Sequence, residues 1–285
     1  MRLLQNRPIC ESLRCPLCQA PLSVHAEGSG SLLCEGIRRH CFDFSSTGYV
    51  NLALPGQSAG GDSKQAVRAR SDFLNGAYYA PVADALCDIV AKHITQADGL
   101  LIDAGCGEGY YTVKLAQRGC SAFGVDLSKF AVDAAAKRAA RAQLTNAFFA
   151  VSSVFELPIA DHCASAVVNV FAPCAEAEFI RVLKKGGILA VALAGPDHLM
   201  GLKRALYDTP RTNEGRADLP CELTLLDEVR VTYEICVEGT ERIQSLFAMT
   251  PYYWKTSRED SEKLSMLDSL TTEVDVRILL YQKTL

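Results

Sequence analysis

The stretch Leu100-Leu101-Ile102-Asp103-Ala104-Gly105-Cys106-Gly107-Glu108-Gly109 decides the fold of this 285-residue chain. Its first five residues form a short apolar run, which is typical of a buried β-strand. Its glycines follow at the point where that strand turns into a helix, and glycine lets a backbone pass close to a ligand because it has no Cβ atom. The stretch therefore predicts the first strand and the binding loop of an α/β sheet.

Apolar runs and helical stretches alternate along the chain around this loop. The expected buried strands are Leu100–Ala104, Ala122–Val125, Ala147–Val151, Ala166–Val170 and Ile188–Ala194. The expected helices are Lys64–Leu74, Pro81–Lys92, Tyr110–Gln117, Lys129–Arg141 and Ala175–Leu183. The run Lys184-Lys185-Gly186-Gly187 is expected to end the last helix, and Glu228–Val237 and Asp275–Gln282 are expected as edge strands. This alternation predicts a doubly wound, mostly parallel sheet.

Composition and charge exclude several classes of protein. Hydrophobic residues make up 49% of the chain and charged residues 22%, which excludes wholesale disorder. No apolar run approaches the ~18 residues of a membrane span, and the first residues lack the apolar core of a secretory signal, so we expect a cytoplasmic protein. The net charge is -4, but residues 1–80 carry eight Lys/Arg and six Asp/Glu, a net of +2. A surface for polyanions is therefore expected toward the N-terminus.

Cysteines crowd into the first part of the chain. Cys15-Pro16-Leu17-Cys18 puts two thiols on one tight turn, and Cys34 and His40-Cys41 follow. This spacing predicts a structural zinc site with all four positions filled by protein. The alternative is a set of unbound cysteines in a small hairpin. His40 and Cys41 are alternatives for the fourth ligand, with Cys10 and His25 as competitors outside the pattern.

The glycine-rich loop indicates a particular kind of ligand. Glu108 lies inside the loop, where its negative charge would repel the pyrophosphate of a dinucleotide. This repulsion disfavours a nicotinamide-dependent enzyme. Glu108 would favour a cationic ligand without phosphate, such as S-adenosylmethionine. Asp126 follows Asp103 by 23 residues, at the end of the second strand, where an acid can accept both ribose hydroxyls. The alternative is a glycine-rich turn with solvated acids.

The chain is expected to divide into three parts. Residues 1–55 form a zinc-finger domain, and residues 56–98 hold a linker and two lead-in helices. The run Pro55–Ser63 has the glycine and serine content of an exposed linker. Residues 99–285 form the α/β domain that contains the glycine-rich loop.

Seven motifs together resemble one enzyme family. They are Cys15-Pro16-Leu17-Cys18, His40-Cys41-Phe42-Asp43, Gly48-Tyr49-Val50-Asn51-Leu52, Gly107-Glu108-Gly109-Tyr110-Tyr111-Thr112, Ala172-Pro173-Cys174, Gly195-Pro196-Asp197-His198-Leu199 and Met249-Thr250-Pro251. In combination they are similar to the RlmA (RrmA/TlrB) family, which methylates guanine N1 in a hairpin of bacterial 23S ribosomal RNA. The resemblance covers nearly the whole chain. It departs from the family between Cys34 and His40, where five residues intervene and an extra cysteine follows.

The resemblance implies a fold, ligands and partners. The fold is a class I (Rossmann-like) methyltransferase domain with a small N-terminal zinc-finger domain. Residues 99–285 would then be the S-adenosylmethionine-dependent methyltransferase domain, and residues 1–55 the zinc-finger domain for RNA recognition. The implied zinc ligands are Cys15, Cys18, Cys34 and His40. With the acids and glycines above, the residues expected at S-adenosylmethionine are Tyr79, Asp103, Gly105, Gly107, Glu108, Asp126 and His198. The implied partners are a 23S ribosomal RNA hairpin and a second copy of the chain in a homodimer.

The chemistry of guanine adds its own demands. Guanine N1 carries a proton at neutral pH, so a base or an anion-stabilising group is required, and Glu108, Asp197 and His198 are candidates. The sequence alone does not choose among them. The aromatic run Tyr252-Tyr253-Trp254 is a candidate for stacking on the base, or for an aromatic core cluster.

Cations near the expected finger and linker form a candidate phosphate-binding patch. They are Arg38, Arg39, Lys64, Arg68 and Arg70. Two other functions stay open at this point: a small-molecule methyltransferase with a structural finger, and a non-catalytic zinc-containing RNA-binding protein.

Overall fold

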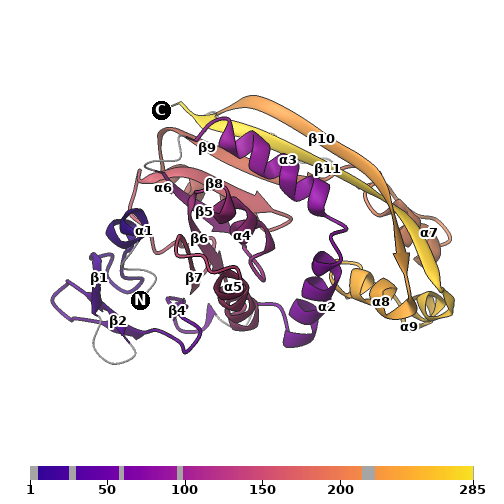
Figure 1. Ribbon diagram of the computed structural model, residues 1–285, viewed down its shortest axis with the longest axis horizontal. Helices are drawn as coiled ribbons and strands as arrows, with labels where there is room; N and C mark the ends of the chain where they lie inside the picture. The colour runs from indigo at the N-terminus through magenta and orange to yellow at the C-terminus, as the bar shows by residue number, and fades with distance from the viewer. Residues whose placement is uncertain (1–5, 26–29, 58–60, 95–98, 214–221, 285) are drawn as a thin grey trace.

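The structure is a computed structural model that describes residues 6–25, 30–57, 61–94, 99–213 and 222–284. An eight-stranded sheet has the order β10-β11-β9-β8-β5-β6-β7-β4, and a three-stranded ribbon has the order β1-β2-β3 (Figure 1). The ribbon strands are β1 (Leu22–His25), β2 (Ser31–Cys34) and β3 (Cys41–Asp43), preceded by α1 (Arg7–Ser12). None of the helices in the described ranges is long and apolar enough to span a membrane.

The large sheet is built mainly from parallel strands. Its strands are β4 (Val50–Asn51), β5 (Leu100–Ala104), β6 (Ser121–Asp126), β7 (Ala147–Val151), β8 (Ala164–Val170), β9 (Leu183–Ala194), β10 (Leu223–Glu238) and β11 (Ser269–Lys283). From β9 to β4 every neighbouring pair is parallel, and β11 and β10 add an antiparallel end. The predicted doubly wound α/β fold is confirmed.

Helices follow the strands as the alternation predicted. They are α2 (Lys64–Asn75), α3 (Ala80–Ala91), α4 (Tyr110–Gln117), α5 (Lys129–Arg141), α6 (Glu176–Val182), α7 (Met200–Leu206), α8 (Thr240–Ala248) and α9 (Arg258–Glu262), and the 3-10 helix η3 (Lys263–Met266) precedes β11. The caps of two helices are visible in the sequence. Ser63 Oγ accepts from the Ala66 N–H at the start of α2, and Ser128 Oγ accepts from the Ala131 N–H at the start of α5.

Two expectations about the later strands are wrong. Asp275–Gln282 was expected at an edge, but β11 lies between β9 and β10, and only β10 is terminal. Lys184–Gly187 was expected to end a helix, but α6 ends at Val182 and these residues begin β9. Gly186 takes a φ of +76° there. Lys184, Lys185 and Gly186, residue types that typically stop a helix, are here exposed at the start of a strand.

Two apolar clusters lie on opposite faces of the sheet. On β5, Leu101 enters the cluster covered by α3, α4 and α5, whereas Leu100 and Ile102 enter the other. Figure 1 shows α3, α4 and α5 in front of the sheet. Alternate residues of a strand point to opposite faces, so strands covered on both sides are apolar throughout. This arrangement leaves the carboxyl ends of the strands as the place where loops meet.

The N-terminal segment packs on the second face of the sheet. Ile9, Leu13 and Leu32 belong to the same apolar cluster as Ile102. The Arg14 N–H donates to the carbonyl oxygen of Pro158 at 2.8 Å. The ribbon is therefore held to the sheet by shared core and by backbone hydrogen bonds.

Strand β4 lies within the expected first part of the chain but belongs to the large sheet. Val50 and Asn51 pair in parallel with Ala150 and Val151 of β7. Hydrogen bonding of the large sheet therefore begins before residue 55. The division into 1–55, 56–98 and 99–285 stays a prediction, and residues 58–60 of the expected linker lie outside the described residues.

Candidate functional site

Four side chains of the ribbon converge on one point. The thiols of Cys15, Cys18 and Cys34 and a ring nitrogen of His40 lie within 4.8 Å of one another. Cys18 Sγ lies 3.3 Å from Cys34 Sγ, and Cys15 Sγ lies 3.3 Å from His40 Nδ1. Zinc bonds of about 2.0–2.3 Å give tetrahedron edges of roughly 3.5–3.8 Å, so the cluster has nearly the size that zinc requires. Cys41 is exposed and lies outside the cluster, so His40 is the fourth donor.

The turn after Cys34 is shaped around these sulfur atoms. A Cβ atom at Gly36 would lie 3.2 Å from Sγ of both Cys18 and Cys34, and the Gly36 N–H donates to Cys34 Sγ at 3.3 Å. Hydrogen bonds of this kind stabilise a thiolate. Three thiols and one imidazole are a donor set that zinc takes in closed structural sites. The residues therefore fit a structural zinc ion with no open position for catalysis.

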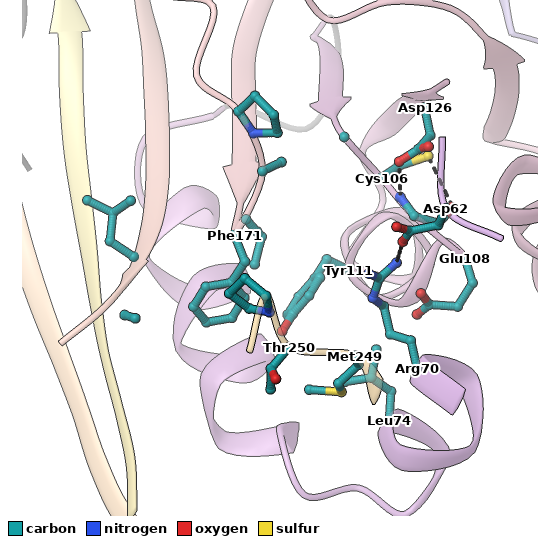
Figure 2. A pocket seen from close by; sticks show the side chains of 18 of the residues that line it. Asp62, Arg70, Leu74, Cys106, Glu108, Tyr111, Asp126, Phe171, Met249 and Thr250 are labelled. Atoms are coloured by element: carbon teal, nitrogen blue, oxygen red, sulfur yellow. Dashed lines mark hydrogen bonds and ion pairs between the residues drawn. The ribbon is translucent and has the colours of Figure 1, made fainter. Parts of the chain in front are cut away.

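A pocket of about 660 Å³ lies at the carboxyl ends of the parallel strands. Its walls include the loop Gly105–Glu108 after β5, Asp126 at the end of β6, Phe171–Pro173 after β8 and Met249–Tyr252 after α8. Figure 2 shows side chains from these segments pointing into one space, together with Arg70. Ligands of open α/β sheets bind at this edge.

The glycine-rich loop folds tightly under the pocket. The N–H groups of Gly105 and Cys106 both donate to the carbonyl oxygen of Val125 at 2.9 Å. Gly105 has a φ of +84°, and a Cβ atom there would lie 2.5 Å from Cβ of Ala172. Only glycine tolerates both the backbone conformation and the close approach. The loop is thus fixed to β6 and to the segment after β8.

Asp126 presents a fixed carboxylate to the pocket. Its Oδ2 accepts from the Gly107 N–H at 3.1 Å, and its Oδ1 accepts from the Ser128 N–H at 2.7 Å. Burial raises the pKa of Asp126, and the two backbone N–H groups oppose that shift. Each oxygen keeps a further lone pair for a ligand. Such a carboxylate is suited to accept hydrogen bonds from two hydroxyl groups of a ribose.

The pocket contains more negative than positive groups. Arg70 Nη1 lies 2.6 Å from Asp62 Oδ2, and Glu108 is only 2% exposed. Among the described lining residues, Arg70 is the one Lys or Arg, and it faces the carboxylates of Asp62, Glu108 and Asp126. Burial raises the pKa of Glu108, against the positive charges of Arg70 and Arg138. The charge pattern suits a ligand that is mainly cationic and has one anionic group.

His198 and Tyr79 form a hydrogen-bonded pair with a defined direction. The Asp275 N–H donates to His198 Nδ1 at 3.2 Å, and His198 Nε2 lies 3.0 Å from Tyr79 Oη. A backbone N–H can only donate, so Nδ1 carries no hydrogen and the neutral ring carries it on Nε2. His198 therefore donates to Tyr79, whose own hydrogen stays available. Burial lowers the pKa of His198 to about 4, so the ring is neutral at neutral pH.

Phe171 has an unusual backbone conformation beside this pair. Its φ is +51°, which is rare for a bulky residue and marks local strain. The residue is 43% exposed, and its ring lies nearly parallel to the His198 ring, with centroids 5.5 Å apart. The pocket thus has an aromatic surface next to the Tyr79 hydroxyl.

Comparison with known proteins assigns the chain to a family. A family model described as a methyltransferase domain matches residues 96–249, and one described as RlmA, N-terminal, matches residues 13–60. YxjB of Bacillus subtilis (strain 168) is 30% identical over 95% of this chain and 96% of its own, and is provisionally named a 23S rRNA (guanine-N(1)-)-methyltransferase. The chain belongs to the RlmA family of methyltransferases.

Two further relatives of this RlmA-family chain carry the same kind of name. A Streptomyces fradiae protein, named 23S rRNA (guanine(748)-N(1))-methyltransferase, is 36% identical over 70% of each chain. A Micromonospora griseorubida protein is 29% identical over 95% of this chain and 97% of its own, and it too is provisionally named a 23S rRNA (guanine-N(1)-)-methyltransferase. The expected RlmA resemblance, methyltransferase fold and zinc ribbon are confirmed.

The pocket brings together most of the residues expected at the donor. Those that line it are Tyr79, Gly105, Gly107, Glu108, Asp126 and His198. Asp103 does not line it, because its buried carboxylate accepts from Thr112 Oγ1 beneath the loop. Burial raises the pKa of Asp103 to about 7. In this RlmA-family chain Asp103 supports α4 and the loop from below.

Several other expected residues lie elsewhere. Asp197 is exposed outside the pocket lining, which removes it as a candidate base. Within the aromatic run only Tyr252 lines the pocket, while Trp254 is 77% exposed. The cationic patch is not continuous, because Arg38 and Arg39 belong to the ribbon and Arg70 faces the pocket. Figure 1 shows α2, which carries Lys64 and Arg68, well apart from the ribbon strands.

Sequence reasoning assigned Arg70 to RNA and gave Tyr111 no role. A signal for Arg70 was present, since it lies three residues after Val67 and four before Leu74, both buried on α2. A cation within the apolar stripe of an amphipathic helix faces the interior and needs a partner there. No comparable signal separates Tyr111 from its neighbour Tyr110.

Proposed function

We propose that the chain transfers the methyl group of S-adenosylmethionine to N1 of a guanine in a hairpin loop of 23S ribosomal RNA. The observation that carries the proposal is the pocket in which Asp126, the glycine-rich loop and Arg70 meet. The named activities of the three relatives support the same reaction.

The polar groups of the pocket match the parts of the donor. When bound, S-adenosylmethionine supplies a methyl group on a positively charged sulfur atom. Asp126 is suited to hold the ribose, and the apolar side chains of Leu127 and Val154 are suited to cover the adenine. Glu108 offers negative charge to the ammonium and sulfonium groups. Arg70 is suited to bind the carboxylate, since guanidinium and carboxylate form paired, charge-assisted hydrogen bonds.

The acceptor guanine has a stacking surface next to the donor site. Phe171 offers an exposed aromatic face at the end of β8, and base–aromatic stacking contributes about 1–3 kcal/mol. A hairpin loop is a favourable target, because its bases leave their stack more readily than those of a duplex. Holding base and donor in line accounts for much of the rate enhancement that we expect.

The proton on guanine N1 must leave during the transfer. His198 is not suited to accept it, because Nδ1 is engaged by a backbone N–H and Nε2 carries the hydrogen. Glu108 is the remaining candidate among the three residues that the sequence indicated, because its carboxylate lines the pocket and can accept a proton. Glu108→Gln is therefore the variant that tests for a base.

The ribbon is proposed to select the RNA. Ile37, Arg38 and Arg39 are exposed on the turn between β2 and β3, directly before the zinc ligand His40. Two solvated cations on a metal-held turn suit contacts with phosphate groups. A cytoplasmic location follows from a ribosomal RNA substrate. A homodimer stays a prediction, and light scattering of the purified chain tests it by measuring the molar mass in solution.

The test is methyl transfer from labelled S-adenosylmethionine to ribosomal RNA, followed by mapping of the modified base. We expect one labelled guanine in 23S RNA, methylated at N1. Asp126→Asn should lose most of the activity, while Asp84→Asn, on an exposed ion pair with Lys114, should keep it. Label that enters only small molecules of a cell extract would favour a small-molecule methyltransferase. RNA binding without any transfer would favour a non-catalytic RNA-binding protein.

A further inference from the structure

Tyr111 carries a buried hydroxyl group without a partner in the described part of the chain. The side chain is 9% exposed, and its Oη atom accepts and donates no hydrogen bond. Leaving a buried hydroxyl unpaired costs roughly 1–3 kcal/mol, so native proteins rarely do so. Of the four unpaired buried atoms in the described residues, this is the one that belongs to a pocket-lining side chain.

The position of Tyr111 relates the hydroxyl to the expected ligand. Tyr111 is the second residue of α4, which begins directly after the glycine-rich loop. Figure 2 shows its ring extending from α4 into the pocket that Arg70 enters from α2. Burial raises the pKa of Tyr111 well above its ordinary value, so the hydroxyl keeps its hydrogen and acts as a donor. A ligand that fills the pocket must therefore offer it an acceptor.

The parts of the donor differ in what they offer to a hydroxyl. The ribose hydroxyls are matched by Asp126, and the ammonium group has no lone pair to accept a hydrogen bond. The carboxylate is the strongest acceptor of the molecule. Negative charge is also favoured near the first turn of a helix, where Tyr111 lies.

We propose that Tyr111 donates its hydroxyl hydrogen to the carboxylate of the methionine part of the bound donor, an inference that rests on the proposed function. Arg70 then supplies the charge and Tyr111 supplies a second, directional hydrogen bond. Ligand binding completes the hydrogen bonding of the pocket, which the protein alone leaves incomplete.

The test measures binding and stability of the full-length chain with Tyr111→Phe. The probes are S-adenosylhomocysteine, which has the carboxylate, and 5′-methylthioadenosine, which lacks the amino-acid part. We expect about a tenfold loss of affinity for the first probe and none for the second, since a hydrogen bond to a charged group is lost. The ligand-free variant should melt at the same or a higher temperature than the unsubstituted chain, because phenylalanine leaves no unpaired hydroxyl.

The matched control is Tyr110→Phe. Tyr110 is the preceding residue of α4, lies under Lys114 and Arg138, and does not line the pocket, so its variant should bind both probes normally. Unchanged affinity of Tyr111→Phe for S-adenosylhomocysteine would overturn the inference. An equal loss for both probes, or a lower melting temperature without ligand, would do the same. An unsubstituted chain that binds neither probe would instead overturn the proposed function.

Discussion

The ribbon and the sheet depend on different forces for their structure. The ribbon strands are three or four residues long, and four metal-ligating side chains hold their turns together. The sheet has an apolar cluster on each face, and the N-terminal segment that carries the ribbon contributes residues such as Leu13 and Leu32 to one of them. A small module buries too little surface to fold on that basis and takes the missing free energy from a metal. The comparison therefore predicts that loss of the ion unfolds the ribbon and leaves the donor pocket in place.

The two regions also expose their functional groups differently. Arg38 and Arg39 are surrounded by water on the ribbon, whereas Glu108 and His198 in the pocket are 2% and 6% exposed. Charges in water interact weakly and are screened by salt, whereas buried groups interact strongly. Substitutions in the pocket should therefore have larger effects than substitutions of the ribbon cations.

Loss of the metal should have the largest effect. Cys15→Ser should abolish zinc binding and unfold the ribbon, because structural zinc contributes on the order of 10 kcal/mol to such modules. Metal analysis and amide hydrogen exchange measure both changes. Exchange should stay slow in β5 to β8, and S-adenosylhomocysteine should still bind. Cys41→Ser is the control and should keep its zinc. A fully loaded Cys15→Ser protein would contradict the ligand assignment.

Acid should weaken the pocket region through His198. The pKa of His198 falls from 6.5 to about 4 on folding, so the unfolded chain takes up a proton that the folded chain rejects. Stability is therefore lost as the pH falls from 6.5 to about 4, by up to about 3 kcal/mol at 1.36 kcal/mol per unit.

Urea unfolding at several pH values measures this loss, with His198→Gln for comparison. The variant should lose less stability than the unsubstituted chain over that range. Asp103 acts with the opposite sign, since its raised pKa of about 7 favours the folded state in acid, but it is present in both proteins. Parallel pH curves for the two proteins would show that His198 is not held neutral by burial.

Removal of the Asp126 carboxylate should weaken donor binding. Asp126→Asn keeps the size of the side chain but loses the charged acceptor, which contributes roughly 1.5–3 kcal/mol and predicts at least a tenfold loss of affinity for S-adenosylhomocysteine. Calorimetry measures the affinity, and Asp84→Asn serves as the control. Equal affinities in the two variants would mean that the ribose binds elsewhere.

Substitution of the ribbon cations should have the smallest effect. Arg38→Ala with Arg39→Ala should lower affinity for the RNA hairpin by about threefold to tenfold. It should also reduce the salt dependence of binding, because a variant that makes fewer phosphate contacts releases fewer counterions when it binds. Filter binding across a salt series measures both. Affinity for S-adenosylhomocysteine should not change. An unaltered salt slope would assign RNA selection to another surface.

The sequence predicted helices and strands well where their bounds depend on residues that are close together in the chain. The bounds of β5, β7, α4 and α5 agree with the predicted ranges, because apolar runs and caps such as Ser128 are read within a few residues. The zinc ligands followed from spacing and family resemblance together. Spacing and family resemblance also predicted the residues at S-adenosylmethionine, and six of the seven line the pocket.

Long-range pairing explains what the sequence did not reveal. The two residues of β4 gain their place from β7, and β11 gains its interior position from pairing on both sides. Neither pairing leaves a periodic signal of its own. Asp103 was expected at the ligand because its spacing suits a binding loop, but only packing shows that its carboxylate faces Thr112.

The pairing of β4 with β7 has a consequence for the order in which parts of the chain fold during synthesis. Asn51 pairs with Val151, which leaves the ribosome 100 residues later. At about 5–20 residues per second, the first strand waits roughly 5–20 s for its partner. The ribbon has its metal ligands by residue 40 and so can fold during that interval. Zinc supply during translation, rather than afterwards, should therefore set the yield of folded ribbon, while the sheet assembles once β7 has been made.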